Sequence, residues 1–167
     1  MELSKGQKIQ LNETFLNIQF ERKSGAVEID TAAFLLEGNG KVNGDEDFVF
    51  YGNARHNSGS VIHKDDDSVE IDLTKVPRHV EKVSITATIY DAEVRKQNFG
   101  KVSNMVLHLK NSSGADIATF KLEKLSIETA IVLGEIYRYK GEWKFNAIGS
   151  GFKGGLRALC LNFGVSV

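Results

Sequence analysis

Hydrophobic and polar residues alternate along most of the chain, and this pattern predicts a protein built from short β-strands. The clearest example is the segment 83–90, where Val83, Ile85, Ala87 and Ile89 alternate with polar residues and a tyrosine. A repeat of two residues is typical of a half-buried strand. Comparable alternation occurs at 15–20, 27–30, 69–73 and 105–109. The turn dipeptides Asn39–Gly40 and Asn43–Gly44 separate such segments. We therefore expect about ten short strands.

Two departures from this alternation define the fold class. Ala32–Leu36 is apolar at every position, which is typical of a strand that enters the core and is covered on both faces. Helical spacing occurs only near the end, where Leu156, Leu159, Cys160 and Phe163 share one face and Gly164 is placed as the C-cap. The sequence thus predicts an all-β fold, a two-sheet β-sandwich of about ten short strands with a short C-terminal helix. We expect one domain over residues 1–167.

Composition limits the classes of partner. A chain of 167 residues with 41% hydrophobic content can bury a sizeable core. Its net charge is −1 and its basic residues are scattered, so we expect no nucleic-acid partner. No apolar run reaches the roughly 20 residues of a membrane span. The single cysteine, Cys160, forms no intramolecular disulfide, which fits a reducing compartment, and we expect a cytoplasmic protein.

Acidic residues at predicted strand ends are the first candidate site. Glu28 and Asp30 project from one face of a strand, roughly 7 Å apart at about 3.3 Å per residue. Asp65–Asp67 precede another strand, and Asp91 follows the strand at 83–90. Hard cations such as Ca²⁺ take six to eight oxygen ligands, which loops at strand ends can supply. An alternative for Asp91 is a hydrogen bond to the amides of its own loop.

Other residues offer less specific chemistry. Gly149–Gly154 reads G-x-G-x-x-G between a strand and a helix, where amides could hold a phosphate. No βαβ unit surrounds it, so a flexible turn is expected there. A small-molecule or nucleotide binder that uses this turn with Lys153 and Arg157 is the alternative function. His63 is expected at the surface. A carboxylate hydrolase built on Asp91 is a third interpretation, but no catalytic arrangement accompanies that residue.

Several motifs together carry a resemblance to a known family. They are Tyr90–Glu93, Gln97–Gly100, Val102–Asn104, Phe34–Leu36, Asp47–Tyr51, Glu128–Ala130, Gly134–Arg138, Gly141–Phe145 and Phe163–Val165. These motifs cover nearly the whole chain in order, and the chain resembles the TerD-like tellurium-resistance and stress-response family. The resemblance implies a bacterial, largely cytoplasmic β-sandwich of the tellurite and general stress response. Because no catalytic arrangement is present, we expect a non-enzymatic binding module that acts with other proteins of that response. The resemblance also implies Ca²⁺ bound by clustered acids at one end of the sandwich.

The chain departs from the family pattern at the acidic segments. Ala26 replaces the first acid of the family's acidic strand, and Glu28 replaces the middle aspartate. Lys64 stands where the family has glycine, and the Gly-rich acidic loop is missing. The resemblance therefore implies one degraded Ca²⁺ site of low affinity. Its expected metal ligands are Glu28, Asp30, Asp65, Asp66 and Asp67, with Asp91 nearby.

Overall fold

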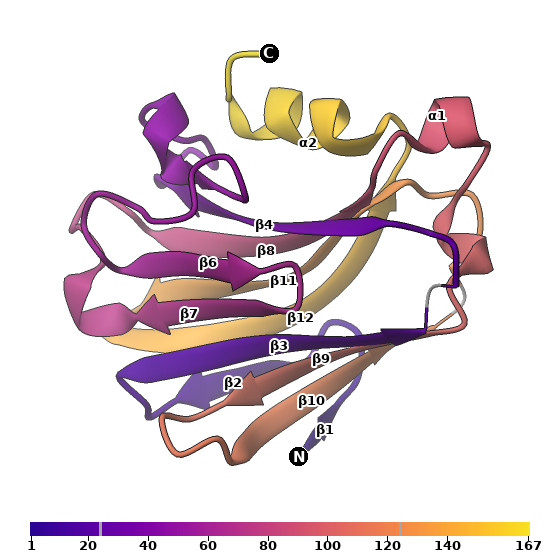
Figure 1. The fold of residues 1–167 in the computed structure, drawn as a ribbon. Helices are drawn as coiled ribbons and strands as arrows, with labels where there is room; N and C mark the ends of the chain where they lie inside the picture. Colours follow the sequence, from indigo (N-terminus) through magenta and orange to yellow (C-terminus); the bar gives the residue numbers. More distant parts are fainter. Residues whose placement is uncertain (24, 124) are drawn as a thin grey trace.

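Two stacked β-sheets, with a helix over one of them, make up the computed structural model, which describes residues 1–23, 25–123 and 125–167 (Figure 1). Within these residues, twelve strands form two sheets of six. The first sheet has the order β1-β10-β9-β3-β7-β6: Glu2–Leu3, Asp116–Leu122, Asn104–Lys110, Phe15–Lys23, Ser68–Asp72 and Val61–Asp65. The second has the order β2-β12-β11-β8-β4-β5: Lys8–Leu11, Glu142–Phe152, Ala130–Tyr139, Lys82–Ile89, Ile29–Leu36 and Phe48–Val49. Only β1 and β10 pair in parallel. The predicted all-β sandwich is confirmed.

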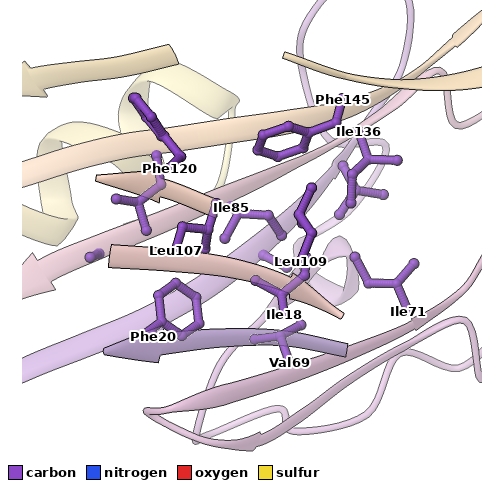
Figure 2. Packing of buried hydrophobic residues seen from close by; sticks show 14 of the residues in the cluster. Ile18, Phe20, Val69, Ile71, Ile85, Leu107, Leu109, Phe120, Ile136 and Phe145 are labelled. Carbon is purple, nitrogen blue, oxygen red and sulfur yellow. The ribbon is translucent and has the colours of Figure 1, made fainter. Parts of the chain in front are cut away.

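The main core fills the space between the two sheets. Alternate residues of each strand point inward, as the period of two predicted. Figure 2 shows the packing of Ile18, Leu107 and Leu109 from the first sheet beside Ile85 and Phe145 from the second. All five side chains are buried. This packing fixes the register of the strands, because a shift by one residue would turn every core side chain toward solvent.

A second core lies on the outer face of the second sheet, below helix α2 (Gly155–Phe163). Phe34 of β4 stacks on Phe48 at 4.7 Å between ring centroids and contacts Phe163 of α2 at the same distance. Leu159 and Cys160 of α2 belong to the same cluster. The fully apolar segment Ala32–Leu36 is explained by this arrangement, because β4 is covered by the first sheet on one face and by α2 on the other.

The prediction that β8 is half-buried is wrong, because helix α2 packs on the outer face of this strand. Ser84, Thr86 and Thr88 are as buried as the apolar residues between them. The Thr86 hydroxyl donates a hydrogen bond of 3.2 Å to the carbonyl of Ala32 on the neighbouring strand. A buried hydroxyl is tolerated where such a partner exists. The polar face of this strand therefore packs inside the protein.

The connection from β8 to β9 crosses from one sheet to the other at one end of the sandwich. It contains the short helix α1 (Ala92–Arg95) and the 3₁₀ turn η3 (Phe99–Lys101). Phe99 is fully buried, and its amide donates to the carbonyl of Glu128 at 2.9 Å. A Cβ on Gly100 would lie 2.6 Å from the Ser126 carbonyl oxygen, so glycine is required there. The crossing is thus anchored to the segment that leads into β11.

The C-terminal part follows the prediction with one correction. Strands β11 and β12 form a hairpin, and β12 continues through Gly149–Gly151, where a flexible turn was expected, to Phe152. Helix α2 ends at Gly164, whose φ of 81° is the left-handed conformation of a glycine C-cap. Within the described residues, no helix is both long enough and apolar enough to cross a membrane. Two further 3₁₀ turns, η1 (Asp45–Asp47) and η2 (Leu73–Lys75), lie in the connections between β4 and β8.

Candidate functional site

The start of β4 and the connection that follows β8 lie at the end of the sandwich that is to the right in Figure 1, and both carry predicted acidic residues. Glu28 and Asp30 stand at the start of β4, and Asp65–Asp67 form the turn between β6 and β7. Asp91 follows β8 and precedes α1. The antiparallel pairing of β4 with β8, which places Ile29 opposite Ile89, explains why the first and last of these segments lie at the same end.

Asp66 links the two sheets at this end. Its Oδ1 atom accepts the backbone N–H of Thr31 in β4 at 3.1 Å and lies 3.3 Å from Nε2 of His63. The Thr31 hydroxyl is 3.1 Å from the same ring nitrogen. The start of β4 has no neighbouring strand on this side, since β5 pairs only with Ala33 and Phe34. A side chain from the first sheet therefore satisfies a free backbone donor of the second.

The expectation that His63 lies at the surface is wrong. Its side chain is buried, and it faces Thr31 and Asp66. The alternation of Val61 and His63 with Ile62 and Lys64 indicates why, because a period of two places His63 on the inward face with Val61.

Asp30 is a half-buried carboxylate at this end, and it has no counterion among the described residues. Burial raises the pKa of Asp30, and the nearby carboxylates of Asp66 and Glu28 raise it further. Arg22 and His63 oppose this shift, without reversing it. Among the residues the structure describes, no ion pair or side-chain hydrogen bond is formed by the Asp30 carboxylate. A half-buried carboxylate surrounded by like charge is stabilised by any cation that reaches it.

The remaining acids are engaged in other ways. Glu28 pairs with Arg95 at 3.2 Å, and Asp67 pairs with Arg22 at 3.1 Å. Asp65 accepts the backbone N–H of Asp67 at 2.7 Å, which closes the β6–β7 turn. Together with Arg22, the side chains of Asp65 and Asp67 line a separate hollow of about 650 Å³. The structure therefore brings Asp30 and Asp66 together, with Glu28 nearby, and directs Asp65 and Asp67 elsewhere.

Asp91 lines a hollow of about 800 Å³ that also contains Asp30, Thr88 and Lys153. Its backbone is left-handed, with φ at 53°. The side chain makes no capping hydrogen bond to the amides of α1. Contrary to the alternative interpretation, the Asp91 side chain accepts no capping hydrogen bond within the described residues, and the residue is exposed at the hollow.

The predicted phosphate-binding turn is largely a strand. Gly149 and Gly151 belong to β12, so only Lys153 and Gly154 connect β12 to α2. The amide of Gly155 donates to the Thr129 hydroxyl at 2.9 Å. Lys153 lines the same hollow as Asp30 and Asp91, whereas Arg157 lies outside it on α2.

The structure contains a buried polar cluster that the sequence did not predict. Asp47 and His56 are both buried, with 2.7 Å between the Asp47 Oδ1 and His56 Nε2 atoms. The backbone N–H of Ser58 donates to His56 Nδ1 at 3.1 Å, so this nitrogen is unprotonated and Nε2 carries the proton that Asp47 accepts. His56 lies nine positions after Asp47, beyond the two-residue strand β5, and no periodic pattern signals their contact.

The fit of a Ca²⁺ ion follows from these contacts. Within the described ranges, no three His, Cys, Asp or Glu side chains are grouped as metal ligands. The Asp66 carboxylate lies close enough to raise the pKa of Asp30, and Arg95 and Arg22 already neutralise Glu28 and Asp67. Two carboxylates, completed by carbonyl oxygens and water, could bind Ca²⁺ with low affinity. High affinity would require more carboxylate ligands than these.

The fold and this acidic end define a class: two-sheet β-sandwiches whose strand-end connections gather carboxylates. A family model described as the TerD domain matches residues 1–163. A tellurium resistance protein TerD of Serratia marcescens is 43% identical, with 83% of this chain and 79% of the relative covered. General stress protein 16U of Bacillus subtilis is 38% identical over 100% of this chain and 98% of its own length.

A solved structure supports the same fold. The crystal structure of a homologue of telluride resistance protein TerD from Streptomyces coelicolor superposes with a TM-score of 0.71 at 14% identity. The superposition covers 89% of this chain and 95% of that one. The chain belongs to the TerD family, and the predicted resemblance is confirmed.

Proposed function

We propose that this chain is a non-enzymatic, cytoplasmic binding module of the tellurite and general stress response, which acts with other proteins of that response and binds Ca²⁺ weakly. Family membership and the tellurium-resistance and stress proteins among its relatives support the first part. The observation that supports cation binding is Asp30, a half-buried carboxylate with two carboxylate neighbours and no counterion within the described chain.

In this proposal Asp30 and Asp66 hold the cation, and Glu28 joins them when it leaves Arg95. A bound Ca²⁺ supplies the positive charge that relieves the repulsion between Asp30 and Asp66. Asp66 also accepts the Thr31 amide, so the same carboxylate couples the β6–β7 turn to β4. Because this site has few charged ligands, we expect a dissociation constant for Ca²⁺ on the order of 10⁻³ M.

Calorimetric titration with Ca²⁺ tests the proposal. At about 5 mM Ca²⁺ and a Kd of about 1 mM, the protein should gain about 1 kcal/mol of stability. For a chain of this size that gain raises the melting temperature by about 2–4 °C. Asp30→Asn should abolish both the heat and the shift, whereas Glu142→Gln, at the exposed tip of the β11–β12 hairpin, should leave them unchanged.

The pH dependence of the titration adds a second readout. Because the pKa of Asp30 is raised, protons compete with Ca²⁺ for this carboxylate at a higher pH than at an ordinary aspartate. As the pH is lowered, the affinity should therefore begin to fall at a higher pH than it would at a site built from ordinary aspartates. Absence of heat and of any melting shift at millimolar Ca²⁺ would contradict the cation site, while the family assignment would stand.

A further inference from the structure

Exposed apolar side chains gather around the hollow that contains Asp30. Of eight large apolar side chains exposed in the described chain, four line it: Tyr51, Tyr90, Val94 and Ile127. Their exposed fractions are 66%, 47%, 76% and 56%. They come from the connection after β5, the β8–β9 crossing and the segment before β11. Single exposed apolar residues are common, but such a group from distant segments marks an interaction surface.

The charges in this hollow are distributed unevenly. Asp30 is half-buried and lacks a counterion, and Asp66 and Glu28 add negative charge near it. Lys96 and Lys153 also line the hollow, but both are exposed and neither forms an ion pair with a described residue. Neither lysine contributes to lowering the pKa of Asp30. The least solvated charge of the hollow is therefore negative and favours a cationic group.

A side chain of the protein itself shows which cationic chemistry suits this end. The Arg95 guanidinium lies 5.0 Å from the centroid of the Tyr90 ring and 3.2 Å from the Glu28 carboxylate. A guanidinium held between an aromatic face and a carboxylate is a favourable arrangement at a partly desolvated surface. Asp30 and Tyr51 line the same hollow and have no comparable cationic partner among the described residues.

We infer that this hollow is a docking surface for a segment of a partner protein that inserts an arginine or lysine side chain toward Asp30. Apolar residues beside that basic side chain cover Tyr51, Tyr90, Val94 and Ile127. A free amine would satisfy Asp30 but leave these four side chains in water, whereas a protein segment covers both. The inference deepens the proposed function, since it states the kind of partner that the binding module takes at its acidic end.

Labelled peptides with defined sequences test the inference. The probes are acetylated, amidated pentapeptides with a central arginine, lysine or neutral glutamine between leucine and phenylalanine flanks, and binding is followed by fluorescence anisotropy at low salt. The arginine and lysine peptides should bind at least about tenfold more tightly than the glutamine peptide. Asp30→Asn should remove this preference. The double variant Val94→Ser, Ile127→Ser should weaken the binding of all three by about tenfold.

A matched control lies outside the hollow. Tyr139→Ser removes an exposed aromatic side chain from the β11–β12 hairpin and should leave peptide binding unchanged. Equal binding of the glutamine peptide, or no binding of any peptide, would overturn the inference. Tight binding of butylammonium alone would assign the hollow to a small amine. A dimer that Val94→Ser disrupts in sedimentation would assign it to a second copy, and either result also overturns the inference.

The Ca²⁺ titration keeps the two proposals separable. The Val94→Ser, Ile127→Ser variant retains Asp30 and Asp66, so its melting shift with Ca²⁺ should equal that of the unmodified protein. Failure of peptide binding with an intact Ca²⁺ response would remove the docking surface alone. Failure of the Ca²⁺ response with intact, arginine-selective peptide binding would remove the metal site alone.

Discussion

Replacing Asp47 with alanine should lower the free energy of unfolding by about 3 kcal/mol. The Asp47 carboxylate accepts the backbone N–H of Asn43 at 3.0 Å and the proton of His56 at 2.7 Å. Both Asp47 and His56 are buried, so the His56 donor would be left without a partner in the variant. A buried donor left without a partner costs its full desolvation energy, which is why the loss exceeds that of an ordinary surface contact.

Urea unfolding monitored by circular dichroism measures this loss. Glu46→Ala is the matched control, since it removes a neighbouring exposed acid of the same 3₁₀ turn and should change stability by less than about 0.5 kcal/mol. The free energy of unfolding of Asp47→Asn should lie between those of Asp47→Ala and Glu46→Ala, because an amide oxygen can still accept one of the hydrogen bonds. Equal stabilities of Asp47→Ala and Glu46→Ala would show that the buried cluster does not hold the segment between β4 and β6.

Phe34→Ala should lower the stability by about 4 kcal/mol, in the upper part of the range for large-to-small changes in a core. Phe34 is fully buried, and its ring stacks on Phe48 while it contacts Phe163 of α2. Removing the ring leaves a cavity between the second sheet and the helix that covers it. The sheet cannot shift to fill this cavity, because the β4 backbone is fixed by its pairing with β8.

The location of the damage is measurable apart from its size. Hydrogen exchange should show greater loss of protection in α2 and β5 than in β9 and β10, which belong to the core between the sheets. Phe34→Leu keeps most of the buried volume and should cost about 1 kcal/mol. Uniform loss of protection across both sheets would contradict the division into two cores.

The elements whose patterns are local were predictable from the sequence. The apolar segment Ala32–Leu36 indicated a strand covered on both faces, and the spacing of Leu156, Leu159 and Phe163 indicated α2 with Gly164 as its cap. The burial of Thr86 was not predictable, since it depends on which strand α2 packs against. A local pattern specifies the period of an element, and the tertiary packing decides whether its polar face meets water.

The candidate site shows the same limit. Periodicity and the family resemblance indicated Glu28, Asp30 and the aspartates at 65–67 as one acidic group. The structure separates them by the partners that folding supplies: Arg95 for Glu28, Arg22 for Asp67 and the Thr31 amide for Asp66. These partners lie between 35 and 67 residues away in the sequence, so no local pattern reveals which acid stays without a counterion. Asp30 emerges as the central residue only once the fold is known.

If the proposed cation site is used in the stress response, the carboxylates of Asp30 and Asp66 are needed for the function of this TerD-family protein. Complementation tests it most directly: a tellurite-sensitive host without TerD-family genes expresses either the unmodified chain or the double variant Asp30→Asn, Asp66→Asn. Immunoblots and melting curves of the purified proteins confirm equal amounts and intact folds. We expect the unmodified chain to restore growth on tellurite and the double variant to fail to do so. Equal growth with both proteins would contradict it.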